Sequence, residues 1–247
     1  MTRREKFEQD GFVAVSKFCG GEELDDIEDA LRRFIGGRLN ALPPEHVFYE
    51  NVNDHGTLKQ IQQLHEHDEF FGAFMDGAPR RLAEELLGEP VMGKNLQYFN
   101  KPPAIGQATP PHQDGFYFML EPCRALTMWM ALDVVDAENG CVRYVRGSHT
   151  RGMRPHGRTE TLGFSQGITD FGQPADSENE VACPAQPGDL LVHQALTIHR
   201  ADANASATRN RRALGFIFYA ESARENVAAH EAYQAELATE LAASGKI

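Results

Sequence analysis

The hydrophobic pattern of this chain changes near residue 91, and that change limits what the chain can fold into. Before it, apolar residues recur at helical spacing, most clearly in residues 21–37. One face of that predicted helix carries four apolar side chains, Leu24, Ile27, Leu31 and Phe34. Beyond residue 91, short apolar runs alternate with Pro, Gly and Asn, which is typical of strands joined by turns.

These two patterns together predict an α+β fold that is mainly β. The predicted strands are residues 7–18, 96–100, 115–120, 125–135, 141–147, 189–199 and 211–220. The further predicted helices are residues 57–75, 78–88 and 223–244. We therefore expect one domain over residues 1–247, with a helix-rich part at 1–90, a β core at about 91–220 and a C-terminal helix within 221–247.

Charge and composition argue against several kinds of partner. The formal net charge is −12, whereas contacts to phosphates need a basic surface, so we expect no nucleic-acid binding. No run of about 18 apolar residues occurs, so we expect no membrane span. The opening MTRREKFEQDGF is unlike a signal peptide, the chain does not end in Ser-Lys-Leu, and the four cysteines lack CxxC spacing. These features predict a cytoplasmic protein.

The stretch PPHQDGFYF, residues 110–118, places two ionisable side chains at the start of a predicted strand. Side chains two apart in a strand share a face, so His112 and Asp114 can chelate one ion. A third ligand would complete the two-His, one-carboxylate set of non-haem Fe(II) oxygenases. The candidate is His199, which ends the predicted strand 189–199, and His193 on the same strand is its rival. For the HxD pair alone, the alternative is a surface turn.

The predicted strand 211–220 indicates what lies beside the metal. Alternation puts Arg211 on a face with Ala213 and Gly215, and puts large apolar side chains on the other face. The small face can line a pocket, and a guanidinium there needs an anion because a buried charge must be paired. Its planar fork matches a carboxylate. A metal with open positions beside a carboxylate held by Arg indicates 2-oxoglutarate.

Several ordered motifs then resemble the phytanoyl-CoA dioxygenase family of Fe(II)/2-oxoglutarate oxygenases: HQD, WMALDVVDAENGCVRYVRGSH, and PGDLLVHQALTIH followed by RRAL. The resemblance covers about residues 6–220 and includes the opening KFEQDGFVAV. It implies a double-stranded β-helix (jelly-roll, cupin-like) core with flanking helices. The implied Fe(II) ligands are His112, Asp114 and His199, and the implied 2-oxoglutarate residues are Arg211, Gln113 and Trp129.

The resemblance also implies a reaction, in which O₂ and 2-oxoglutarate give succinate and CO₂ while an unactivated C–H of a small molecule is hydroxylated. Asp114 favours hydroxylation, because related halogenases carry a small residue in its place. One alternative is a non-catalytic, cupin-like metal- or ligand-binding protein on the same scaffold, which would not need Arg211. A second is an interaction module that has lost its iron, which the intact His–Asp–His set argues against.

The substrate is the least defined part of the prediction. Tyr98, Phe116 and Phe118 either line its cavity or belong to the core. Arginines are concentrated in residues 142–158, and Arg154 and Arg158 there predict an anionic small-molecule substrate steered to the pocket mouth. The alternative is a solvated loop whose arginines pair with surface carboxylates.

Overall fold

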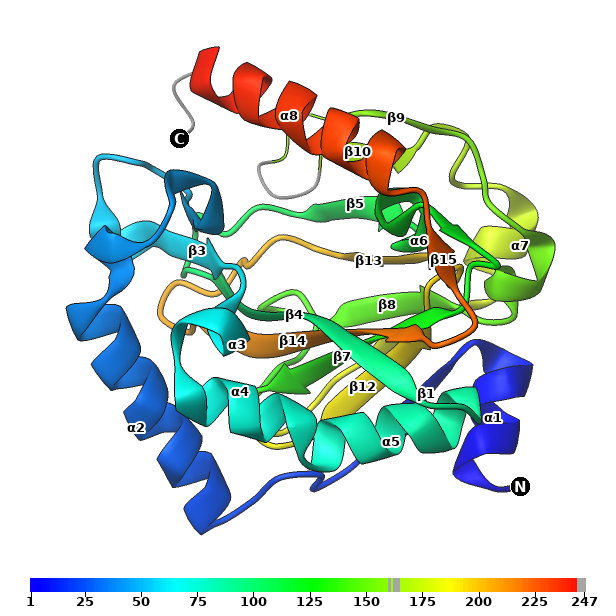
Figure 1. Cartoon of the computed structure of the whole chain (residues 1–247), viewed down its shortest axis with the longest axis horizontal. Helices are drawn as coiled ribbons and strands as arrows, with labels where there is room; N and C mark the ends of the chain where they lie inside the picture. Colours follow the sequence, from blue (N-terminus) through cyan, green and yellow to red (C-terminus); the bar gives the residue numbers. More distant parts are fainter. Residues whose placement is uncertain (160, 162–164, 244–247) are drawn as a thin grey trace.

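The computed structural model describes residues 1–159, 161 and 165–243, and it consists of two facing antiparallel sheets with helices on the outside (Figure 1). The larger sheet has the strand order β1-β12-β7-β14-β4-β3-β2. Its strands are β1 (Phe12–Val15), β2 (Val47–Tyr49), β3 (Leu58–Ile61), β4 (Val91–Lys101), β7 (Ala125–Ala131), β12 (Leu190–Gln194) and β14 (Arg211–Ala220).

The smaller sheet has the order β11-β8-β13-β5, and two short ribbons, β9-β10 and β6-β15, extend the β structure. The strands of the smaller sheet are β5 (Thr109–His112), β8 (Val142–Val145), β11 (Glu180–Cys183) and β13 (His199–Ala201). The ribbons are formed by β6 (Leu120–Glu121), β9 (His156–Arg158), β10 (Gln166–Ile168) and β15 (Arg224–Glu225).

Helices cover the outer face of the larger sheet, and one long helix crosses the opposite side of the molecule (Figure 1). The helices are α1 (Arg3–Asp10), α2 (Glu22–Gly37), α3 (Leu64–His67), α4 (Glu69–Asp76), α5 (Ala78–Leu87), α6 (Gly115–Phe118), α7 (Pro174–Ser177) and α8 (Val227–Ala243). Within the described ranges, none of them has the length and apolar character needed to cross a lipid bilayer.

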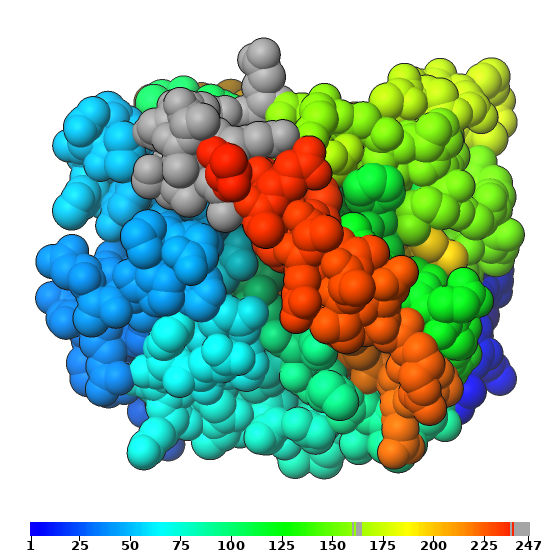
Figure 2. Space-filling view, turned by 45° about the horizontal axis from the view of Figure 1, so that its top comes forward, coloured from blue at the N-terminus to red at the C-terminus, as the bar shows by residue number. Residues whose placement is uncertain are grey.

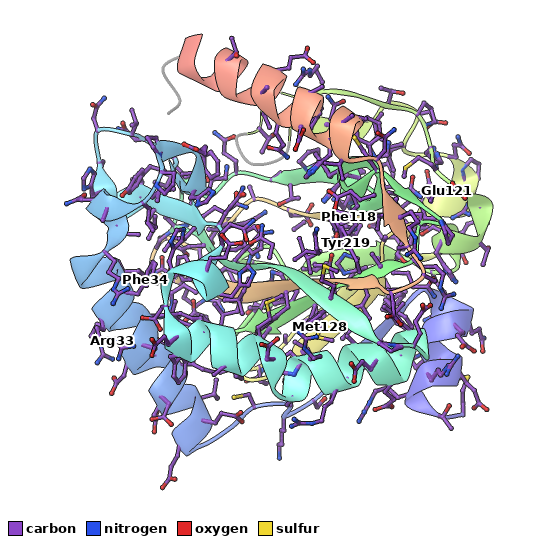
Figure 3. All side chains as sticks on the ribbon, in the orientation of Figure 1. Arg33, Phe34, Phe118, Glu121, Met128 and Tyr219 are labelled. Carbon is purple, nitrogen blue, oxygen red and sulfur yellow. The ribbon has the colours of Figure 1, made fainter. Side chains whose placement is uncertain are left out.

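The alternation predicted for β14 is confirmed and explains how the larger sheet is used. Leu214, Phe216 and Phe218 are fully buried in the main core, where Phe216 meets Phe74 of α4 at a ring-centroid distance of 5.6 Å. The opposite face of β14 looks into the space between the sheets. In Figure 3, Met128 lies on the helix-covered side, whereas Phe118 and Tyr219 lie together on the other. One face of the sheet therefore builds the core and the other faces a cavity.

Four local predictions need correction. Residues 3–10 of the N-terminal segment form α1, and only residues 12–15 form a strand. Residues 58–61, expected to be helical, form the fully buried strand β3. The apolar run 115–118 forms one helical turn, α6, in place of a strand. The run 189–199 is two strands in different sheets, β12 and β13, so His193 and His199 do not share a strand. By contrast, the helices predicted at 21–37 and 78–88 are present, and the helix predicted at 223–244 is present as α8 over Val227–Ala243, after the short strand β15; residue 244 lies outside the described residues.

Candidate metal centre

A cavity of about 1000 Å³ lies between the two sheets. Its walls come from β3, β4, β7 and β14 on one side and from β5, β8 and β13 on the other. One face of α8 closes part of it, and Figure 2 shows this helix, in orange and red, lying across the molecule. A cavity of this size can hold a small cofactor and a drug-sized ligand together.

Three predicted ligand residues meet in this cavity. His112 ends β5, and His199 begins β13 directly opposite it in the antiparallel register. Asp114 lies two residues beyond β5, and its Oδ1 is 3.4 Å from Nε2 of His112 and 3.6 Å from Nε2 of His199. One donor atom from each residue lies within 4.8 Å of the others. The three side chains can therefore bind one ion together, although Asp114 reaches the site from a helical turn and not from a regular strand.

Backbone carbonyls fix the orientation of both histidines. Nδ1 of His112 is 2.8 Å from the carbonyl of Pro110, and Nδ1 of His199 is 3.0 Å from the carbonyl of Thr197. A carbonyl only accepts, so each Nδ1 carries the proton and each Nε2 keeps a free lone pair. Two neutral imidazoles and one carboxylate oxygen are a donor set that suits Fe(II), with positions left open for other ligands.

The protonation states agree with this reading. Burial raises the pKa of Asp114, but the imidazoles of His199, His112 and His193 together lower this pKa by more. The pKa of Asp114 therefore lies well below its usual range. Burial, followed by the neighbouring His112 and His193, lowers the pKa of His199 well below its usual value. Asp114 is therefore ionised and His199 neutral at neutral pH, as metal ligands must be.

Arg211 lies deep in the same cavity, where no described residue forms an ion pair with it. It is 4% exposed, its guanidinium lies 5.1 Å from the ring centre of Trp129, and its Nε has no hydrogen-bond partner among the described residues. Burial lowers its pKa to about 10, so it still carries its charge at neutral pH. A buried cation needs a pairing anion, and its planar fork matches a carboxylate, so Arg211 is a candidate site for one. This observation fits a bound 2-oxo dicarboxylate.

Lys101 is a basic residue of this site that sequence reasoning missed. It faces Arg211 in the register of β4 and β14, and its Nζ donates to the carbonyl of Asp202 at 2.7 Å. Burial, together with the charges of Arg211 and Lys59, lowers its pKa well below the usual value. Alternation in β4 could have revealed it, because Lys101, Phe99, Gln97 and Asn95 all line the cavity.

Three predicted pocket residues have other roles. Gln113 does not line the cavity, because its amide is fully buried and donates to the carbonyls of Gly152 and Leu196 at 2.9 and 2.7 Å. Tyr98 is buried in the main core on the opposite face of β4. Phe116 stacks on His156 at 4.5 Å, outside the cavity lining. By contrast, Phe118 does line the cavity, as does Trp129.

Of the two arginines predicted at the mouth, only Arg158 reaches the cavity. It is on β9 and bonds to Glu236 of α8 at 3.1 Å. The prediction for Arg154 needs correction, because its guanidinium turns away and bonds to Asp176 at 2.9 Å and to Asp170 at 3.0 Å. Asp176 is fully buried, so this ion pair belongs to the scaffold.

Comparison with known proteins places this geometry in context. A model of the phytanoyl-CoA dioxygenase family matches residues 7–213. The peroxisomal phytanoyl-CoA dioxygenase of Mus musculus is 24% identical over 220 residues, which cover 83% of this chain and 64% of that protein. The chain thus spans less than two thirds of that relative.

Solved structures share the architecture. EvdO2 from Micromonospora carbonacea var. aurantiaca, complexed with 2-oxoglutarate, is 27% identical with a TM-score of 0.70, covering 90% of this chain and 91% of that one. The epimerase SnoN, in complex with Fe3+, alpha ketoglutarate and nogalamycin RO, is 23% identical with a TM-score of 0.72, covering 90% and 84%. These similarities confirm the predicted double-stranded β-helix with flanking helices.

Proposed function

This chain belongs to the phytanoyl-CoA dioxygenase family, and on that premise we propose that it is an Fe(II)- and 2-oxoglutarate-dependent oxygenase acting on a small molecule. One observation carries the proposal. A single cavity contains both a group that suits Fe(II), His112, Asp114 and His199, and a buried Arg211 that lacks a carboxylate partner among the described residues.

Each residue then has a role set by its position. The iron would be bound by His112, His199 and Oδ1 of Asp114. The distal carboxylate of 2-oxoglutarate would be bound by Arg211, whose guanidinium lies over the ring of Trp129. When bound, iron and 2-oxoglutarate supply the oxidation by O₂ that produces succinate and CO₂. The protein contributes the orientation of the bound groups and a cavity between the two sheets that α8 partly closes.

Hydroxylation of an unactivated C–H is the outcome that we propose. Asp114 would occupy the coordination position that the small residue of related halogenases leaves to a halide. The same scaffold supports other oxidative outcomes, because SnoN is described as an epimerase. Product analysis distinguishes hydroxylation from these outcomes.

The basic residues that line the cavity near α8 indicate whether the substrate must be anionic. Lys94 bonds to Glu225 at 3.0 Å and Arg158 bonds to Glu236 at 3.1 Å, so both cations near α8 already have carboxylate partners. With Arg154 in the scaffold, the case for an anionic substrate is weaker than the sequence suggested. We propose a small molecule that need not be anionic. The cytoplasmic location stays a prediction that rests on the cysteine pattern, and the mouse relative is described as peroxisomal.

The competing hypothesis is a cupin-like metal-binding protein without catalysis. A protein that only binds a metal does not need buried basic side chains in the same cavity. An unpaired buried charge destabilises the fold, so such residues are retained only where they bind something. Arg211 and Lys101 together therefore favour the oxygenase.

The test combines spectroscopy with turnover. Fe(II) and 2-oxoglutarate added without oxygen should give a visible charge-transfer band, and oxygen should then yield succinate across a panel of candidate substrates. His112→Ala and His199→Ala should abolish the band, because each removes one of three protein ligands. His55→Ala, an exposed His outside the cavity, is the control. A normal band in His199→Ala would contradict the proposed ligand set.

A further inference from the structure

We propose that Thr127, His193 and Tyr144 are positioning residues that hold Asp114 as a ligand through one oxygen only. This inference rests on the proposed function, because it assumes that Asp114 binds a metal. None of the three belongs to the implied ligand set of His112, Asp114 and His199, and their contacts give His193, the rival to His199 in the sequence, a different role in the cavity.

The two oxygens of Asp114 have different surroundings. Oδ1 faces the two histidines of the smaller sheet at 3.4 and 3.6 Å. Oδ2 instead faces the larger sheet, where Oγ1 of Thr127 lies at 2.5 Å and Nε2 of His193 at 3.0 Å. Thr127 on β7 and His193 on β12 are direct cross-strand neighbours, so one rigid pair of side chains holds this oxygen.

The direction of each hydrogen bond follows from the proposed role of Asp114, because a carboxylate that binds a metal carries no proton. Oδ2 can only accept, so the Thr127 hydroxyl and the His193 Nε2–H must both donate to it. His193 Nδ1 is then an acceptor, and the hydroxyl of Tyr144, 3.1 Å away, donates to it. In this state His193 Nε2 has no lone pair for a metal, which makes His193 a support for Asp114 and not a ligand.

Tyr144 is itself held in place. Its side chain is fully buried, and its ring stacks on Phe12 of β1 with centroids 4.7 Å apart. The series from Tyr144 through His193 therefore connects the core of the sheets to Oδ2 of Asp114, the oxygen that does not face the other two ligands. Without donors on Oδ2, the carboxylate could rotate and offer both oxygens to one ion. That would occupy a position that 2-oxoglutarate or O₂ needs.

The test measures binding of Co(II) alone to the metal-free protein, by calorimetry and by the visible absorption of the bound ion. Thr127→Val keeps the side-chain shape and removes the hydroxyl, and His193→Phe removes both hydrogen bonds of the ring. Mutation of a residue that hydrogen-bonds to a metal ligand typically lowers the metal affinity by about 10- to 100-fold. We expect losses in that range with an altered Co(II) spectrum, and we expect Thr127→Ser to restore affinity to within about twofold of wild type.

Controls separate positioning from folding. Thr57→Val makes the same change at a buried hydroxyl outside the cavity and should leave Co(II) binding unchanged even if thermal stability falls. Folded Thr127→Val and His193→Phe proteins with wild-type affinity and spectrum would overturn the inference. Complete loss in His193→Phe with no change in Thr127→Val would also overturn it and make His193 a ligand. Failure of the wild-type protein to bind Co(II) would refute the metal site itself, and hence the proposed function.

Discussion

Replacing Arg211 by Met should weaken 2-oxoglutarate binding without destabilising the apo protein. Met keeps the length of the apolar stem and removes the charge. In the structure that charge is buried, has no ion pair among the described residues and lies beside the basic Lys101 on the neighbouring strand β4. The guanidinium therefore destabilises the folded protein until a bound carboxylate pairs with its charge.

The expected changes in 2-oxoglutarate affinity and in unfolding free energy can both be given a size. Charge-assisted hydrogen bonds contribute about 1.5–3 kcal/mol, so Arg211→Met should raise the Kd for 2-oxoglutarate about 10- to 150-fold. Burial lowers the pKa of Arg211 to about 10, which disfavours the charged folded state by roughly 3 kcal/mol. This penalty is complete below about pH 10 and falls as the pH rises from there toward the ordinary pKa of an arginine in the unfolded chain. At neutral pH, the unfolding free energy of apo Arg211→Met should therefore stay constant or rise by up to about 3 kcal/mol.

Arg212 provides a matched control with the opposite outcome. It is next in the chain, on the other face of β14, and it bonds to Asp133 at 2.6 Å and Glu28 at 2.8 Å. Arg212→Met should lose about 1–2 kcal/mol of stability, a few degrees in Tm, and keep its affinity for 2-oxoglutarate.

The chain has one tryptophan, and it provides the assay. Trp129 lies under the Arg211 guanidinium, so its fluorescence should report binding of 2-oxoglutarate in the presence of Mn(II). Calorimetry gives an independent Kd, and thermal denaturation of the apo proteins gives the stability change. If Arg212→Met weakens 2-oxoglutarate binding and Arg211→Met does not, the assignment of the carboxylate site is refuted.

Three further outcomes are expected. Asp114→Gly should give little or no hydroxylated product, measured by mass spectrometry with and without chloride, because it removes a ligand; wild-type hydroxylation would contradict the triad. Arg154→Ala should lower stability by about 3–5 kcal/mol, roughly 10 °C in Tm, because it leaves the buried Asp176 with only Arg151, 4.0 Å away, as an ion-pair partner among the described residues, and substrate KM should not change at any salt concentration. Tyr233→Ala on the cavity face of α8 should raise substrate KM several-fold and leave the Kd for 2-oxoglutarate unchanged; equal effects on both would contradict a substrate role for α8.

Period-two alternation predicted the β14 side of the site well. The small face and the apolar face of residues 211–220 are where the pattern put them, because this strand is regular along Arg211–Ile217 and both faces are buried against distinct surroundings. The amphipathic helix at 21–37 was predictable for the same reason: its apolar face packs on one continuous core.

The HQD segment shows where local patterns fail. Its aromatic run, GFYF, has strand propensity, yet it forms α6, and Asp114 immediately before this helix has helical φ and ψ of −59° and −31°. The cause is a long-range contact: Gly115 N–H donates to the carbonyl of Ala195 at 2.8 Å. A Cβ at Gly115 would lie 2.6 Å from Sγ of Cys123, so only glycine permits this approach without a shift. The helical turn directs Asp114 toward the histidines, a result that alternation cannot produce.

Within the apolar run 189–199 the chain passes from the larger sheet to the smaller one, and sequence patterns did not predict this change of sheet. After Gln194 the chain turns, with Thr197 N–H bonded to the Gln194 carbonyl at 2.8 Å and its hydroxyl donating to the Gly11 carbonyl at 2.8 Å. Both halves of the run are buried, so hydrophobicity gives no sign of the crossing. The crossing leaves His193 on the larger sheet and His199 on the smaller one, with Asp114 between them. Two histidines six residues apart can thus act on opposite oxygens of one carboxylate, His193 by orienting it and His199 by sharing a metal with it.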